Sequence, residues 1–141
     1  MENKETYINL FKQVEKLKNS DDAKRKYEYI LWLGKKLKVP NNDILIPENK
    51  VQGCISEVFV RACFQEGKLY WEGYSDALIT KGLLAFLIIG MNELTPKEVV
   101  NIDSIFIEET GLKTSLTPSR SNGFLNILLK MQSQANYFLS E

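Results

Sequence analysis

The stretch Val51-Gln52-Gly53-Cys54-Ile55-Ser56 places a cysteine directly after a glycine, where a polar loop gives way to a run of β-forming residues. Glycine adopts backbone angles that are closed to other residues, so we expect a sharp turn at Gly53 that presents Cys54 at a loop tip. The residues that follow, 57–60, are typical of a strand that holds the end of this loop. A cysteine in such a position is either a small buried hydrophobe or a working thiol.

The composition excludes several kinds of site. With 141 residues, the chain is long enough to bury its own core, and we expect a single domain over residues 1–141. Eighteen basic and eighteen acidic residues leave no net charge, which argues against nucleic acid or an anionic membrane as a partner. The absence of histidine excludes a Ser-His-Asp triad, a Cys-His pair and histidine-containing metal sites. Two cysteines cannot complete a Cys₃ or Cys₄ ligand set. A metal site made only of carboxylates stays open, but the sequence has no calcium-loop or phosphate-loop pattern, and we expect no bound metal.

The two cysteines indicate a reducing compartment. A continuous strand between Cys54 and Cys63 would separate them by roughly 30 Å at about 3.3 Å per residue, which is too far for a disulfide. We therefore expect unpaired thiols, with Cys63 on a sheet face or in the core. The N-terminus lacks the apolar core of a signal peptide, and the nearly apolar run 83–91 is too short to span a bilayer. These features favour a cytoplasmic protein.

Two helices are predicted before the cysteine loop. Apolar residues recur at helical spacing from Tyr7 to Leu17, which indicates a first amphipathic helix. Residues 20–22, Ser-Asp-Asp, provide a cap and first-turn acids for a second helix, which we expect to end near Gly34. Residues 35–49 contain two prolines among polar residues, and we expect a loop with extended pieces there.

A hairpin and further helices are predicted after it. Strands are expected from Ile55 to about Phe64 and over 69–74, joined by a turn at 65–68. A buried helix should run from Ala77 towards Gly90, capped by Ser75 and Asp76. A capping box at 95–98 opens a short helix, residues 103–110 form another that ends at Gly111, and a long C-terminal helix starts within 117–123. The prediction is an α+β fold, with a small antiparallel sheet packed against N-terminal and C-terminal helices.

Three residues are candidates for chemistry. The thiolate is the nucleophilic form of cysteine, and in a chain without histidine only Lys, Arg or a helix end could lower the pKa of Cys54. Arg120 lies in the compact turn Pro-Ser-Arg-Ser-Asn-Gly, as a surface charge, a donor that holds the loop, or a stabiliser of an anion. We expect Asp76 to cap the helix that follows it, whatever further role it has in the loop or towards a partner.

Three segments together resemble the SufE family. They are NKVQGCISEVF at 49–59, GYSDALITKGL at 73–83 and LTPSRSNGF at 116–124, and residues 26–30 resemble its N-terminal helix. The likeness covers nearly the whole chain and implies a fold like that of the IscU scaffold. Phe59 stands where tryptophan is common in the family, and Tyr74 where a small or acidic residue is usual.

The resemblance implies a sulfur-transfer role. SufE-like proteins accept sulfur from the persulfide of a type II, pyridoxal-phosphate-dependent cysteine desulfurase such as SufS, stimulate that enzyme, and pass the sulfur to an iron–sulfur scaffold complex. The family's acceptor cysteine falls on Cys54, and its aspartate and arginine positions fall on Asp76 and Arg120. The chain itself then needs no cofactor, because the pyridoxal chemistry belongs to the partner, and it is a transfer partner rather than a stand-alone enzyme.

Other classes of protein compete with this interpretation. An IscU-type cluster scaffold needs several ligands, and two poorly spaced cysteines without histidine do not provide them. A stand-alone thiol hydrolase or peroxidase would need a base beside the cysteine. An activator or interaction module of a desulfurase, with a cysteine that is never persulfidated, remains the principal alternative.

Overall fold

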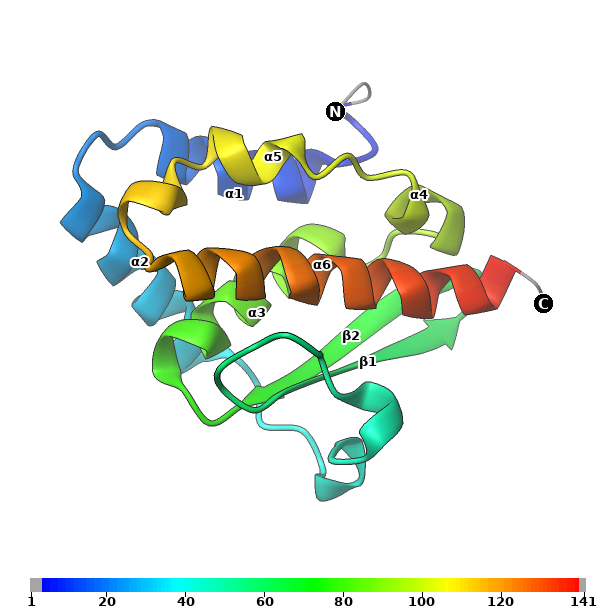
Figure 1. The fold of residues 1–141 in the computed structure, drawn as a ribbon. Helices are drawn as coiled ribbons and strands as arrows, with labels where there is room; N and C mark the ends of the chain where they lie inside the picture. Colours follow the sequence, from blue (N-terminus) through cyan, green and yellow to red (C-terminus); the bar gives the residue numbers. More distant parts are fainter. Residues whose placement is uncertain (1–3, 140–141) are drawn as a thin grey trace.

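The computed structural model describes residues 4–139 and confirms the α+β fold. A two-stranded antiparallel sheet is flanked by helices from both halves of the chain (Figure 1). The elements are α1 (Ile8–Lys18), α2 (Ala23–Lys36), η1 (Asn42–Ile44), η2 (Pro47–Asn49), β1 (Val58–Gln65), β2 (Lys68–Ser75), α3 (Leu78–Met91), α4 (Pro96–Val100), α5 (Ile105–Glu109), η3 (Leu112–Thr114) and α6 (Pro118–Leu139).

The hairpin forms where its turn residues predict it. Strands β1 and β2 pair in register from Val58↔Ser75 to Gln65↔Lys68. The two turn residues, Glu66 and Gly67, both have positive φ angles of 50° and 81°, as a two-residue type I′ turn requires. Strand β1 begins at Val58 rather than at the expected Ile55, because residues 51–57 form the loop that carries Cys54.

Helix α3 is the centre of the core. Eleven of its residues are buried, and it contacts α1, α2, α6 and β2. The face of the sheet that carries Val58, Val60, Leu69 and Trp71 belongs to the same buried cluster. Helix α6 packs along β1 and meets the core through Phe124, whose ring lies edge-on to Phe86. The nearly uniform apolar character of α3 thus predicted its central place correctly.

The second helix ends two residues after Gly34, near the expected place, but Gly34 does not terminate it. Helix α2 continues to Lys36, and Gly34 lies inside it, against α3. A Cβ atom at Gly34 would lie 2.8 Å from the backbone nitrogen of Gly82, and one at Gly82 would lie 2.0 Å from the carbonyl oxygen of Ile30. Glycine at position 34 therefore allows α2 and α3 to cross closely, and it does not end α2.

Two of the predicted helix caps are present. The Asp22 carboxylate accepts a hydrogen bond from the backbone N–H of Lys24 at 2.9 Å and caps α2. Thr95 and Glu98 form the expected capping box at α4. Within residues 4–139, no helix is both long and apolar enough to cross a membrane.

Candidate functional site

The loop that presents Cys54 is closed at its base by backbone and side-chain contacts. The Val51 N–H donates to the carbonyl oxygen of Val58 at 2.8 Å, and the Asp76 N–H donates to that of Glu57 at 3.3 Å. Between these points the chain turns at Gly53, whose φ of 79° fulfils the predicted need for glycine. In Figure 1 the loop lies beside the beginnings of α3 and α6.

The Cys54 side chain is half-buried against α6. Its Sγ lies 3.8 Å from the carbonyl oxygen of Gly123, to which the thiol donates. A Cβ atom at position 123 would lie 3.4 Å from this sulfur, so glycine allows the thiol to lie close to the helix. The recess beside the thiol is small, with a volume of about 10 Å³.

Arg120 lines the same recess and holds the loop through hydroxyl groups. Its guanidinium donates to the hydroxyl of Ser56 in the loop and, at 2.8 Å, to that of Thr80 in α3. The backbone N–H of Arg120 donates to the Thr117 hydroxyl, which caps the first turn of α6. The turn that sequence analysis singled out thus starts α6 and directs Arg120 towards the cysteine loop.

The structure corrects the role assigned to Asp76. The N-cap residue of α3 is Ala77, and no side chain caps this helix. The Asp76 carboxylate instead accepts from the backbone N–H of Glu57 at 3.0 Å, at the end of the cysteine loop. The loop, rather than the helix, uses this carboxylate, because Ala77 has an extended backbone that separates Asp76 from the first helical turn.

Burial and Arg120 act in opposite directions on the Cys54 thiol. Desolvation raises the pKa of Cys54 above its ordinary value, and the positive charge of Arg120 partly offsets this rise. Because the net pKa is raised, the thiol is predominantly protonated at neutral pH while the loop is docked.

Cys63 lies on the sheet, as expected, on the face turned away from the core cluster. Its thiol donates to the Glu72 carboxylate at 3.6 Å, and both cysteines are unpaired thiols. Burial, and then the charge of Glu72, raise the pKa of Cys63. It is therefore a poor nucleophile at neutral pH.

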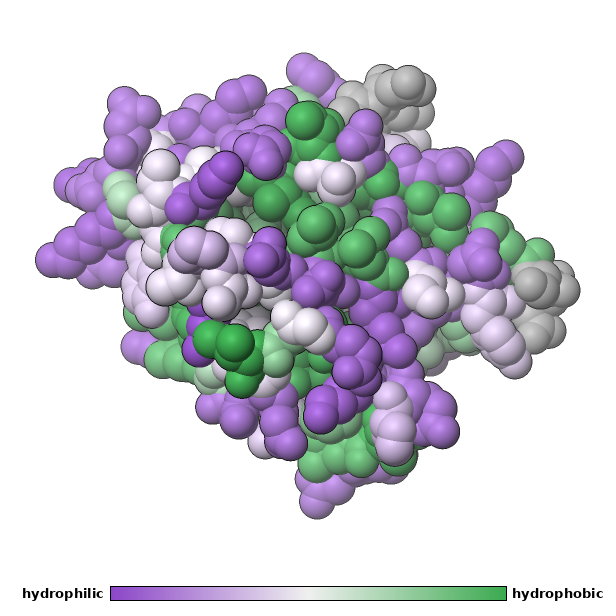
Figure 2. Space-filling model, in the orientation of Figure 1, coloured by the Kyte–Doolittle hydropathy of each residue, from purple (hydrophilic) through white to green (hydrophobic). Residues whose placement is uncertain are grey.

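Apolar side chains are exposed around the cysteine loop. Ile55 is 69% exposed and Leu78, the first residue of α3, is 45% exposed. Figure 2 shows hydrophobic surface here and also between α5 and α6, where Ile105 and Leu129 are 51% and 49% exposed. Exposed apolar groups beside a reactive thiol offer a surface to a partner protein.

Sequence analysis missed the residue that holds the loop tip. The Asn126 side-chain amide donates to the carbonyl oxygen of Gly53 at 3.2 Å. Its nitrogen would lie 2.6 Å from a Cβ atom at position 53, so it packs tightly on the glycine. Asn126 lies three residues after Gly123 on α6, and this helical spacing is the one signal in the sequence that could have placed both beside the loop.

The described side chains at the site do not form a group of metal ligands. Among the described residues, no group of three or more Cys, Asp or Glu side chains could hold a metal ion. What the arrangement offers is a single thiol, a guanidinium and several hydroxyl and amide groups that hold a loop.

Comparison with known protein families identifies the family of this chain. The family model described as SufE, an Fe–S metabolism associated domain, matches residues 12–135 and so covers most of the chain. The chain belongs to the SufE family. Membership of this family associates the chain with Fe–S metabolism and agrees with the resemblance carried by the three sequence segments.

Similar SufE proteins occur in several organisms. The chain is 50% identical to a SufE-like protein of Synechocystis sp. over 92% of its own length and 82% of that protein. It is 40% identical to SufE-like protein 1, chloroplastic/mitochondrial, of Arabidopsis thaliana, covering 91% of this chain and 33% of that protein. It is 33% identical to the cysteine desulfuration protein SufE of Plasmodium falciparum, covering 76% of this chain and 45% of that protein. The chain therefore spans less than half the length of the latter two relatives.

A solved structure supports the fold alone. The solution structure of a hypothetical protein from Thermus thermophilus superposes with a TM-score of 0.80 over 94% of this chain and 97% of that one. Sequence identity is 24%, so the likeness bears on the architecture and not on the activity.

Proposed function

We propose that this SufE protein accepts sulfur from the persulfide of a type II, SufS-like cysteine desulfurase onto Cys54, stimulates that enzyme, and passes the sulfur to an iron–sulfur scaffold complex. The observation that carries the proposal is the placement of Cys54, on a loop that hydrogen bonds to α6 hold beside Arg120. The name of the Plasmodium relative, a cysteine desulfuration protein, supports a desulfurase as the partner.

The transfer is a thiol exchange without net oxidation. The Cys54 thiolate attacks the outer sulfur of the donor persulfide, a new S–S bond forms at Cys54, and the donor's own S–S bond breaks. The donor leaves as a thiolate and takes up the proton that Cys54 has lost. Arg120, which already acts electrostatically on this thiol, favours the anionic forms before and after transfer. Pyridoxal phosphate on the partner supplies the chemistry that releases sulfur from cysteine.

The docked loop is the resting form of this carrier. The recess beside the thiol is small, at about 10 Å³, and the raised pKa of Cys54 favours its protonated form while the loop is docked. Transfer therefore requires the loop to leave α6, which breaks the contacts of Gly53 with Asn126 and of Ser56 with Arg120. A partner that binds the exposed apolar side chains of Ile55 and Leu78 supplies the free energy for this step.

One observation favours the activator module as a second candidate. The free thiol is half-buried and its pKa is raised, which suits a cysteine that is never persulfidated. In that case the partner would respond to the loop and its apolar neighbours, and Cys54→Ser would stimulate the desulfurase as well as the natural chain does.

Intact mass after incubation with a SufS-like desulfurase and cysteine tests the proposal. We expect an addition of about 32 Da per sulfur, by ordinary atomic mass, that a reductant removes and that peptide mapping places on Cys54. Cys63→Ser, the matched control, should take up sulfur normally, whereas Cys54→Ser should take up none.

Loss of the apolar contact gives a second arm of the same experiment. Ile55→Asp should reduce both stimulation and uptake about tenfold or more while the fold is kept, because its side chain is 69% exposed. Stimulation without any mass addition would favour the activator module, and neither effect with several SufS-like enzymes would refute the proposed partner class.

A further inference from the structure

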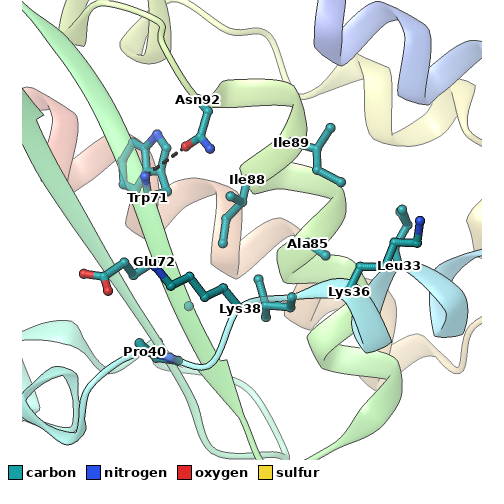
Figure 3. Close-up of a pocket in the computed structure, with 12 residues that line it drawn as sticks. Leu33, Lys36, Lys38, Pro40, Trp71, Glu72, Ala85, Ile88, Ile89 and Asn92 are labelled. Carbon is teal, nitrogen blue, oxygen red and sulfur yellow. Dashed lines mark hydrogen bonds between the residues drawn. The ribbon is translucent and has the colours of Figure 1, made fainter.

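A second cavity lies on the side of α3 opposite the Cys54 recess (Figure 3). Leu83 lines the recess, whereas Ala85, Ile88 and Asn92 line the cavity. At about 100° per residue, Leu83 and Ala85 point to nearly opposite faces of α3. The cavity has a volume of about 250 Å³, and its remaining walls come from the end of α2, residues 37–40 and β2.

The wall formed by β2 presents a short length of unpaired strand edge. The N–H of Trp71 points away from β1, because it donates to the Asn92 side chain at 2.9 Å. Since successive residues of a strand alternate in direction, the N–H and C=O of Gly73 and the C=O of Trp71 also point away from β1. Gly73 lines the cavity, and its N–H makes no hydrogen bond to an acceptor among the described residues. A backbone donor in this position is free to bind an acceptor that enters the cavity.

The polar groups that this edge offers to a ligand are those of the backbone. The Trp71 indole nitrogen also has no hydrogen-bond partner within the described part of the chain, but it is fully buried and so is not open to a ligand in the cavity. The N–H of Gly73 and the carbonyls of Trp71 and Gly73 suit a ligand that both accepts and donates hydrogen bonds.

The charge at the mouth of the cavity is positive. Lys38 extends across it towards β2 in Figure 3. The other lysine of the lining, Lys36, is held 3.9 Å from the centre of the Trp32 ring. The acid of the lining, Glu72, already pairs with Arg61 at 2.8 Å. Lys38 is therefore placed to meet a negatively charged group.

We propose that this cavity binds a free α-amino acid with an apolar side chain of about four carbons. Its carboxylate accepts from the Gly73 N–H and from Lys38, its ammonium donates to the strand carbonyls, and its side chain fills the space between Leu33 and Ile88. At roughly 30 Å³ for each water-sized group in a liquid, the cavity holds about eight such groups, close to the nine heavy atoms of leucine.

The length of the open edge argues for a small molecule rather than an added strand. Asn92 occupies the edge at Trp71, and the segment containing Pro40 passes the strand at the other end of the cavity. Only about two residues of edge remain between them, whereas strand addition uses a longer row of backbone groups.

The test is titration of the ¹⁵N-labelled protein with L-leucine, followed by NMR. The chain has two tryptophans, so the indole N–H signal of Trp71 reports the cavity and that of Trp32 serves as an internal control. We expect saturable shifts of the Trp71 indole and the Gly73 amide with a dissociation constant of about 1 mM or tighter. The compounds 4-methylpentanoate and 3-methylbutylamine, which lack the ammonium and the carboxylate, should bind at least about tenfold more weakly.

Lysine variants complete the experiment. Lys38→Ala should weaken L-leucine binding about threefold to tenfold, whereas Lys35→Ala, an exposed lysine of the same helix end that does not line the cavity, should not. Sulfur uptake on Cys54 should be unchanged in both variants, which keeps this proposal separate from the proposed function. Absence of shifts at Trp71, equal binding of 4-methylpentanoate, or tighter binding of N-acetyl-leucine, as a peptide end would give, would each overturn it.

Discussion

At Cys54 the balance between burial and the charge of Arg120 decides how much thiolate exists before a partner arrives. Burial is the larger effect and raises the pKa, and Arg120 is the group that opposes it. Below the pKa of a thiol, the thiolate fraction falls tenfold for each pH unit, so the docked loop limits the reactivity of Cys54 near neutral pH. Docking of the loop against α6, which buries the thiol, thus also lowers the reactivity of Cys54.

The first prediction concerns the pH dependence of Cys54 alkylation in a Cys63→Ser background. The rate should rise with pH through a pKa above that of a free cysteine, because desolvation disfavours the thiolate. Arg120→Gln should move this pKa further upward, because it removes the positive charge that partly offsets the effect of burial. Thr80→Val, which removes a hydrogen bond of Arg120 but leaves its charge, should not. A pKa that stays constant or falls in Arg120→Gln would contradict the electrostatic role.

The second prediction separates the loop role of Asp76 from a helix cap. Asp76→Ala should remove the acceptor for the Glu57 N–H and release the loop base, which raises the alkylation rate of Cys54 about twofold to tenfold for a hydrogen bond worth about 0.5–1.5 kcal/mol. Asp76→Asn keeps a side-chain oxygen and should resemble the natural chain. A loss of α3 helicity in Asp76→Ala, with the alkylation rate unchanged, would restore the cap and contradict the loop role.

At the scale of elements, periodicity and capping residues in the sequence predicted most helices. The role of Gly34, in contrast, depends on a contact between two helices. The apolar spacing of α1, the cap of α2, the capping box of α4 and the turn at Glu66 and Gly67 are local signals, and the structure confirms them. Gly34 was misjudged because glycine at a helix end and glycine at a helix crossing look identical in one sequence. The difference depends on Gly82, which lies far away in the chain.

The third prediction uses this crossing, where helix propensity and packing predict opposite signs. Alanine favours a helix interior over glycine by about 1 kcal/mol, so propensity alone predicts that Gly82→Ala stabilises the protein. Packing predicts destabilisation by about 2–4 kcal/mol, because the new Cβ would lie 2.0 Å from the carbonyl oxygen of Ile30. Urea unfolding measures the sign. Ser133→Ala, an exposed position in α6, controls for propensity and should change stability by less than about 0.5 kcal/mol. A stabilised Gly82→Ala would contradict the close crossing.

At the scale of the whole molecule, the candidate site joins three segments that lie far apart in the sequence. Cys54, Asp76 and Arg120 were each singled out from their local setting, and the structure brings all three to one loop. Thr80, which binds Arg120, carries no local signal, and Asn126, which binds Gly53, carries only its helical spacing from Gly123. Both acquire a role only when the fold brings them beside the loop. What sequence alone could not provide is therefore the set of long-range hydrogen bonds that restrain the thiol.

The last prediction concerns Lys26, which connects the N-terminal half to the segment that leads into α6. Lys26 is only 8% exposed, and its ammonium donates to the carbonyl oxygen of Thr110 at 2.9 Å. Lys26→Met leaves this buried carbonyl without a donor and should cost about 1–3 kcal/mol. For a protein of this size, each kcal/mol lowers Tm by about 2–4 °C.

The matched control for this variant is Lys24→Met, an exposed lysine in the first turn of α2. It should leave Tm within about 1 °C of the natural value, because it leaves no buried group unpaired. Because η3 begins two residues after Thr110 and leads into α6, Lys26→Met should also speed amide hydrogen exchange over residues 112–123, the segment that positions Arg120 beside Cys54. Equal Tm and equal exchange in the two variants would show that the buried ammonium does not hold this segment in place.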